Sequence, residues 1–262
     1  MKFGILENGQ AKGILALFAT ALPALATKPA AFYLAGDSTT AAQSSDGGGW
    51  GVGFLKTLAH GAIGTDLGYN GDTTASFVSG GAWANVIDVV TRSVSHFQPY
   101  VTIQFGHNDQ KTTSGVTLAE YAINLENMTQ AVLSAGGIPI LVTPLSRRTF
   151  NSTTGLVIED LATQRNITIA VAESIGVDYI DLNKASTQYL DAIGATDSAT
   201  YNRVTTDYTH LNPTGSVLFG NMVSWLLLTT TSRGANLQDY TIPSPQIVHA
   251  IKTGAYIYPT AS

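Results

Sequence analysis

Short apolar runs alternate with helix-like segments from residue 31 to about residue 230, and this alternation limits the possible folds more than any other feature of the chain. Strands are predicted at 31–35, 63–69, 100–105, 138–142 and 177–182. Helices are predicted at 50–59, 83–94, 118–135, 156–175 and 213–229. Because strands that alternate with helices are joined by right-handed crossovers, we expect a parallel sheet covered by helices on both faces.

Specific residues mark the ends of two of these helices. Thr117 and Glu120 form a capping box, in which each side chain bonds the backbone amide of the other residue. The pair Gly136-Gly137 ends the helix that this box begins. Pro213 suits the first turn of the last helix, where its missing amide proton is not needed.

Two polar motifs follow directly after expected strands. Ser38 lies in Gly36-Asp37-Ser38 and Asn108 lies in Gly106-His107-Asn108-Asp109. Each motif taken alone is also typical of a turn or of a helix N-cap. Parallel sheets bind ligands beyond the carboxyl ends of their strands, so the two motifs are expected at one edge of the sheet, and this favours a functional role for both.

A serine hydroxyl needs a nearby base before it can act as a nucleophile, and His210 is the candidate. Asp207 lies three residues earlier, close enough in a turn to accept the Nδ1 proton and leave Nε2 free for the serine. The spacing alone also fits a loop histidine beside an aspartate cap. Its place just before the helix that starts at Pro213 favours the catalytic interpretation.

The negative oxygen that forms during attack on an ester needs hydrogen-bond donors. The Asn108 side chain and the backbone amides of Ser38 and Gly71 are the candidates, although Asn70-Gly71 also fits a simple turn. Nucleophile, base, orienting acid and donors thus occur in order along the chain. The ordered set predicts serine-based acyl transfer.

Composition excludes several other functions. The 262 residues suffice for one sizeable core, so one catalytic domain is expected. Charged residues make up only 12% of the chain and the formal net charge is −5, which argues against nucleic acid and anionic membranes as partners. The glycine-rich loop Gly47-Gly48-Gly49-Trp50-Gly51 fits neither a P-loop nor a dinucleotide-binding motif.

Cysteine is absent, so a thiol nucleophile, a thiolate metal site and disulfides are excluded. The five histidines show neither the HExxH nor the HxxxH spacing of zinc hydrolases. We therefore expect no metal and no cofactor.

Residues 1–26 are predicted to be a signal peptide. Lys2 and Lys12 precede an apolar run that closes on Ala24-Leu25-Ala26, a small-x-small cleavage pattern. A buried N-terminal helix is the alternative interpretation. Three Asn-X-Ser/Thr sequons agree with a secreted glycoprotein, at Asn127, Asn151 and Asn166.

The motifs together resemble those of the SGNH (GDS-type) hydrolases over about residues 31–230. The strings Tyr33–Thr39, Ile103–Asp109 and Asp207–Gly215 are most similar to the rhamnogalacturonan acetylesterase branch. The resemblance implies a three-layer α/β/α flavodoxin-like fold with a five-stranded parallel sheet in the order 2-1-3-4-5. It also implies Ser38 as nucleophile, His210 as base and then acid, Asp207 as its orienter, and an oxyanion hole of Ser38, Gly71 and Asn108.

The chain departs from that branch in several places, among them a short loop at Gln110–Val116 and the lack of the disulfides that some relatives have. Asp72-Thr73 follow Gly71 where relatives often carry Arg-Ser, so a cationic contact is missing. Residues 233–262 have no counterpart that we can place, so we divide the chain into a signal peptide, a hydrolase domain at 27–232 and a C-terminal extension. These differences concern the substrate more than the reaction.

Six further residues are candidate substrate contacts, namely Asp37, Thr39, Trp83, His107, Arg147 and Arg148. The two arginines suit uronate carboxylates and Trp83 suits a sugar ring, although core packing for Trp83 and a solvated loop for one arginine are the alternatives. We expect a secreted, monomeric esterase that removes O-acetyl groups from a pectic polysaccharide or oligosaccharide. The alternatives are a broader acyl esterase or lysophospholipase, and a carbohydrate-binding relative without turnover.

Overall fold

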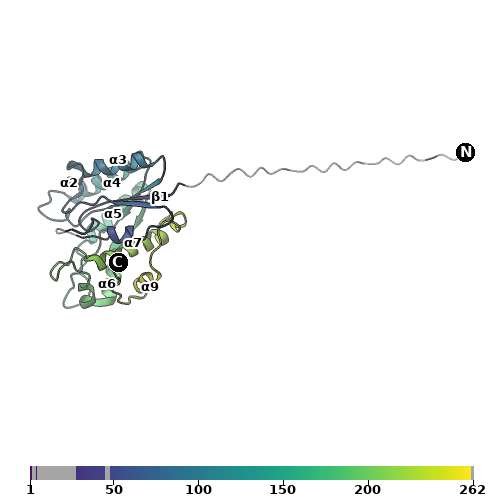
Figure 1. Ribbon diagram of the computed structural model, residues 1–262. Coiled ribbons are helices and arrows are strands. Elements are labelled where there is room, and N and C mark those ends of the chain that lie inside the picture. The colour runs from purple at the N-terminus through teal and green to yellow at the C-terminus, as the bar shows by residue number, and fades with distance from the viewer. Residues whose placement is uncertain (2–3, 5–27, 45–47, 261–262) are drawn as a thin grey trace.

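The computed structural model describes residues 1, 4, 28–44 and 48–260. Within these residues, five parallel strands form one sheet in the order β2-β1-β3-β4-β5, with helices on both faces (Figure 1). The strands are β1 (Ala30–Gly36), β2 (Ile63–Asp66), β3 (Gln98–Gln104), β4 (Ile138–Val142) and β5 (Asp178–Ile180). The predicted three-layer α/β/α fold and its strand order are therefore confirmed. Apart from residues 1 and 4, the expected signal peptide lies outside the described residues, so it stays a prediction.

The alternation of side chains along β1 divides the interior into two cores. Tyr33 and Ala35 face a core shared with α2 (Thr74–Ser79), α3 (Ala82–Ser93), α4 (Leu118–Ser134) and α5 (Ala162–Ile175). Phe32 and Leu34 face the opposite core, shared with α1 (Gly51–Leu55), α6 (Leu182–Ala199) and α7 (Pro213–Thr230). Each face of the sheet is thus sealed, which leaves the ends of the strands as the places for polar chemistry.

The capping residues act as the sequence predicts. Thr117 Oγ1 accepts the Glu120 amide at 3.2 Å, and Glu120 Oε2 accepts the Thr117 amide at 2.7 Å. Pro213 is the first residue of α7, and the Asn212 side chain accepts the amide of Gly215 at 2.8 Å. These contacts satisfy backbone amides that have no partner inside a helix.

Other boundaries differ from the prediction. The helix expected from residue 156 begins only at Ala162, because Val157 forms an antiparallel bridge with Phe150. Helix α6 was not predicted from the sequence, and it contains Gly194 in a non-helical conformation that interrupts its pattern. The predicted helix at 50–59 is shorter, since α1 ends at Leu55.

The C-terminal extension packs against the core that contains Phe32 and Leu34. It contains α8 (Gly234–Leu237) and α9 (Pro245–Thr253). The Ile242 amide donates to the Thr57 carbonyl at 2.8 Å, and the Tyr258 ring stacks on Tyr201 at 6.3 Å. Residues 233–260 thereby cover apolar surface of the domain.

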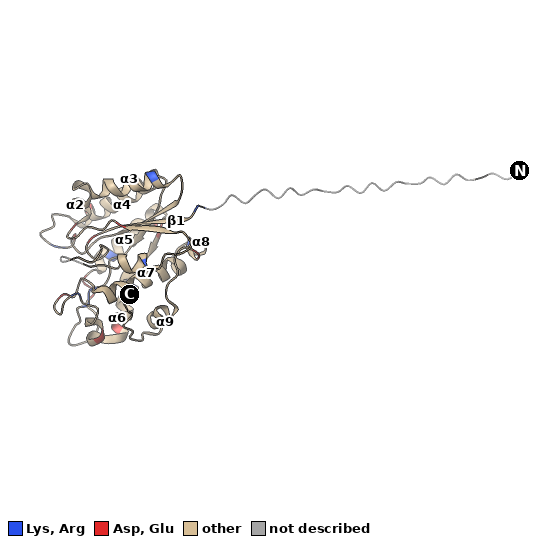
Figure 2. Cartoon of the chain, in the orientation of Figure 1, with Lys and Arg blue, Asp and Glu red and all other residues tan. Residues whose placement is uncertain are grey.

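The charged side chains are sparse and scattered over the ribbon (Figure 2). Among the helices of the described residues, none combines the length and the apolar composition needed to cross a bilayer.

Candidate active site

Ser38, in the loop after β1, and His210, in the loop between α6 and α7, lie together although 172 residues separate them in the sequence. Ser38 follows β1, and its Oγ lies 2.8 Å from His210 Nε2. His210 Nδ1 lies 2.9 Å from Asp207 Oδ2. The three side chains therefore form a continuous hydrogen-bonded chain from hydroxyl to imidazole to carboxylate, the arrangement that activates a serine.

The Asp207 carboxylate fixes the orientation of the imidazole. Its Oδ1 accepts the amides of Thr209 at 3.1 Å and His210 at 2.9 Å. Burial acts to raise the pKa of Asp207, but the hydrogen bonds from the His210 amide and ring and from the Thr209 amide outweigh it and lower the pKa. The ionised carboxylate holds the proton on Nδ1, so Nε2 can accept the Ser38 proton.

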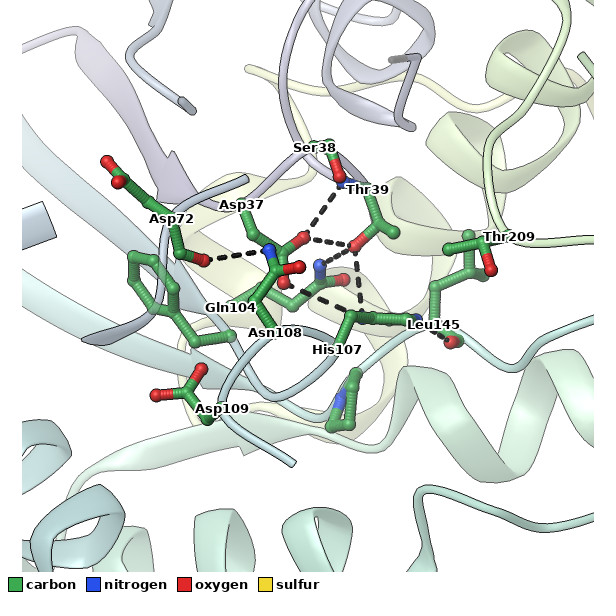
Figure 3. A network of polar contacts seen from close by, with 12 residues as sticks. Asp37, Ser38, Thr39, Asp72, Gln104, His107, Asn108, Asp109, Leu145 and Thr209 are labelled. Carbon is green, nitrogen blue, oxygen red and sulfur yellow. Dashed lines mark hydrogen bonds and ion pairs between the residues drawn. The ribbon is translucent and has the colours of Figure 1, made fainter. Parts of the chain in front are cut away.

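Three groups are the predicted oxyanion donors, namely the Asn108 side chain and the Ser38 and Gly71 amides. Asn108 Nδ2 donates to the Asp72 carbonyl at 2.9 Å, which leaves its second proton unused, and Figure 3 shows this amide group facing Asp72. Gly71 has a φ of +84°, a left-handed conformation that favours glycine. Within the part of the chain that the structure describes, neither the Ser38 amide nor the Gly71 amide donates to a protein acceptor. These groups are suited to bind a negative oxygen.

Three of the predicted substrate contacts are buried beneath the nucleophile. Asp37 and Thr39 are fully buried and His107 is 2% exposed. Asp37 Oδ1 accepts the Thr39 amide at 2.8 Å and its hydroxyl at 2.7 Å, while His107 Nε2 donates to the Leu145 carbonyl at 2.9 Å (Figure 3). Despite its burial, the pKa of Asp37 is lowered by His107 and Thr39. The prediction that these side chains contact substrate was wrong, because they support the loop from within.

Trp83 also belongs to the core. Its side chain is 8% exposed and packs against Phe77, with ring centroids 6.4 Å apart. Core packing, the alternative interpretation of Trp83, is therefore confirmed.

The two predicted arginines bind protein groups. Arg147 pairs with Asp160 at 2.5 Å and donates to Thr209 Oγ1 at 3.1 Å. Arg148 is 2% exposed, so the prediction that it contacts substrate was wrong. Its guanidinium donates to the His210 carbonyl at 2.6 Å and to Asn202 Oδ1 at 2.6 Å.

Arg148 therefore stabilises the loop that carries His210, a structural role that the sequence did not reveal. Burial lowers the pKa of Arg148 to about 10, and the charge of Asp207 offsets part of that effect. The partner Asn202 lies 54 residues further along the chain, so no local pattern around Arg148 points to it.

Within the described residues, no group of three or more His, Cys, Asp or Glu side chains is arranged to hold a metal.

The half-buried carboxyl group of Asp66, the last residue of β2, lies against α1. Its Oδ1 accepts the Gly68 amide at 3.0 Å, whereas Oδ2 has no hydrogen-bond partner within the described residues. A Cβ atom on Gly51 would lie 2.3 Å from Oδ2, so only glycine lets α1 approach this closely. Burial raises the pKa of Asp66 to about 7, and the bond from Gly68 offsets only part of this effect.

We expect Asp66→Asn to stabilise the protein at alkaline pH. An acid whose pKa is higher in the folded state contributes stability below its unfolded pKa of about 4, and that contribution is lost as the pH rises through 7. The variant stays neutral, so its Tm should exceed that of the wild type by roughly 3–8 °C at about pH 8 and match it at about pH 4. Thermal unfolding across this range, with the exposed Asp88→Asn as control, measures the effect. A difference that does not vary with pH contradicts it.

Taken together, the site and the fold define a class of enzyme. A serine–histidine–aspartate arrangement with an amide donor, at the carboxyl edge of a parallel 2-1-3-4-5 sheet, is that of a serine ester hydrolase. The chain matches the GDSL-like Lipase/Acylhydrolase family over residues 34–218 and belongs to that family. The resemblance of its motifs to those of the SGNH (GDS-type) hydrolases agrees with this family.

Similar proteins agree with the family and with the fold. Rhamnogalacturonan acetylesterase RhgT of Bacillus subtilis is 28% identical over 174 residues, which cover 65% of this chain and 72% of the relative. The solved structure of YXIM from Bacillus subtilis aligns with a TM-score of 0.66 at 23% identity, over 77% of this chain. The chain spans little more than half, 56%, of that protein. The acetylxylan esterase Axe2 of Geobacillus stearothermophilus aligns with a TM-score of 0.56 at 18% identity, over 77% of this chain and 94% of its own.

Proposed function

We propose that the protein is a secreted, monomeric carbohydrate esterase that removes O-acetyl groups from a pectic polysaccharide through an acyl-serine intermediate. The observation that carries the proposal is the chain of contacts from Ser38 Oγ to His210 Nε2 at 2.8 Å and from His210 Nδ1 to Asp207 Oδ2 at 2.9 Å.

In the proposed mechanism, His210 Nε2 takes the Ser38 proton while Oγ attacks the acetyl carbonyl carbon. The carbonyl oxygen becomes negative and binds the Ser38 and Gly71 amides and Asn108 Nδ2. His210 then gives its proton to the departing sugar oxygen. Water, deprotonated by the same imidazole, hydrolyses the acetyl-serine and restores the enzyme.

An acetylated carbohydrate is the substrate that the similar proteins favour. RhgT is a rhamnogalacturonan acetylesterase and Axe2 an acetylxylan esterase. The Axe2 structures include catalytic mutants that each lack a serine, an aspartate or a histidine, the three residue types that we assign here.

Two exposed aromatic side chains lie close in sequence to site residues and suit a sugar. Tyr69 is 63% exposed and lies two residues before Gly71, and Tyr208 is 44% exposed and lies two residues before His210. An aromatic ring held in solvent next to a catalytic residue offers an apolar face on which a pyranose ring can stack.

Release of acetate from a panel of acetylated pectins, acetylated xylans and aryl esters of increasing acyl length tests the proposal. We expect the highest kcat/KM on acetylated pectin and on the acetyl member of the aryl series. Preference for long acyl chains would instead indicate a lysophospholipase-type enzyme, and sugar binding without turnover would indicate a carbohydrate-binding protein. Mass spectrometry of the extracellular protein tests secretion, since cleavage after Ala26 leaves Thr27 at the N-terminus.

A further inference from the structure

The side-chain amide of Asn108 is held at both ends. Its Oδ1 accepts a hydrogen bond from Lys111 Nζ at 2.6 Å, and its Nδ2 donates to the Asp72 carbonyl at 2.9 Å. Rotating the amide by half a turn would place its NH2 group against the ammonium and its oxygen against a carbonyl. Both contacts would then be repulsive, so the two partners together select one orientation.

The selected orientation is the one that acyl transfer needs. The NH2 group has two protons, of which one binds the Asp72 carbonyl and the other is left for the oxyanion. In the reversed orientation, Asn108 would present an oxygen to the negative charge of the transition state. An ammonium bound to Oδ1 also polarises the amide and makes its N–H groups stronger donors.

Lys111 is placed for this contact by the turn that carries it. The Lys111 amide donates to the Asn108 carbonyl at 3.1 Å, and the Lys111 carbonyl accepts the Ser114 amide at 2.9 Å. Among the ion pairs of the described residues, Lys111 takes part in none, so no carboxylate competes with Asn108 for its ammonium. The side chain is exposed, and little of the fold depends on it.

We propose that Lys111 is a positioning residue, whose ammonium orients and polarises the Asn108 amide for oxyanion binding. This inference rests on the proposed function, because it gives Lys111 its effect through a donor of the oxyanion hole.

Kinetics of Lys111→Met on p-nitrophenyl acetate test the inference. We expect kcat to fall about tenfold with KM changed less than about twofold, because Lys111 strengthens the hydrogen bond from Asn108 to the oxyanion, and that bond forms only in the transition state. Lys111→Arg, which keeps charge and donors, should recover most of kcat. Lys252→Met, which removes an exposed lysine of α9, is the matched control and should behave as the wild type.

A double-mutant cycle with Asn108→Ala separates positioning from a direct effect of the charge. Asn108→Ala alone should lower kcat by about 10²–10³. In that background Lys111→Met should change kcat less than about twofold, since the group that it positions is gone. An unchanged tenfold loss in that background, a rise confined to KM, or wild-type kinetics of Lys111→Met would each overturn the inference.

Failure of this inference is distinguishable from failure of the proposed function. Hydrolysis of p-nitrophenyl acetate by the wild-type protein, and its absence in Ser38→Ala, report on the function. The ratio of the kcat of each Lys111 variant to the kcat of the wild type reports on positioning alone. Should Lys111→Met lower the Tm, the comparison of Lys111→Arg with Lys111→Gln at unchanged Tm tests the same contact, with the loss of kcat expected only in Lys111→Gln.

Discussion

Ser38→Ala is expected to lower kcat by a factor of about 10⁴–10⁶ on any ester that the wild-type protein hydrolyses. The hydroxyl is the only group at this position that can form the acyl-enzyme, and its Oγ lies 2.8 Å from His210 Nε2. Water attacking in its place must do without a covalent intermediate. The oxyanion donors remain in the variant, so a small residual rate should persist.

The same variant should fold normally. Ser38 is 5% exposed, and its Oγ contributes the contact to His210. Removing one oxygen at the surface edge of a loop leaves the buried Asp37–Thr39 contacts unchanged. The Tm should therefore stay close to that of the wild type, which separates loss of chemistry from loss of structure.

Labelling with a fluorophosphonate provides the measurement. Wild-type protein should gain one covalent adduct, mapped to Ser38 by mass spectrometry, whereas Ser38→Ala should gain none. Ser79→Ala, which removes an exposed hydroxyl on α2, is the control and should label like the wild type. Near-wild-type turnover by Ser38→Ala, or an adduct on another residue, would remove the nucleophile assignment.

Much of this arrangement follows from local sequence and one rule of parallel sheets. Ser38 and Asn108 each follow a strand-like run, and the carboxyl ends of parallel strands share an edge. The sequence therefore predicted that both would lie at one edge, and the structure places them there. The positions of Thr117 and Pro213 at the starts of helices were also predictable, because helix capping depends on residues that are neighbours in the sequence.

Features that depend on distant partners were not predictable. The sequence around Arg148 suggests an exposed loop cation, yet its side chain is buried because Asn202 and the His210 carbonyl bind it from another loop. For Trp83 the sequence left open a sugar contact and core packing, because spacing does not show that its ring packs against Phe77. The contact between Lys111 and Asn108 joins residues that are only three positions apart, but the sequence spacing does not show how their side chains are oriented.

His210→Ala is expected to lower kcat by about as much as Ser38→Ala, by a factor of about 10⁴–10⁶. Without the imidazole, the Ser38 hydroxyl keeps its proton and the sugar oxygen leaves without one. The exposed His96→Ala serves as control, since the described contact of His96 is made by its backbone amide.

The double variant Ser38→Ala/His210→Ala gives the stronger test of this pair. The serine and the imidazole act on the same proton, so removing one of them also removes the catalytic effect of the other. The double variant should therefore be no more than about threefold slower than either single variant. If the kcat of the double variant instead falls by the product of the two single losses, His210 acts on the substrate independently of Ser38. Because the 2.8 Å contact between Oγ and Nε2 is the physical basis of the proposed function, that result would require a different mechanism.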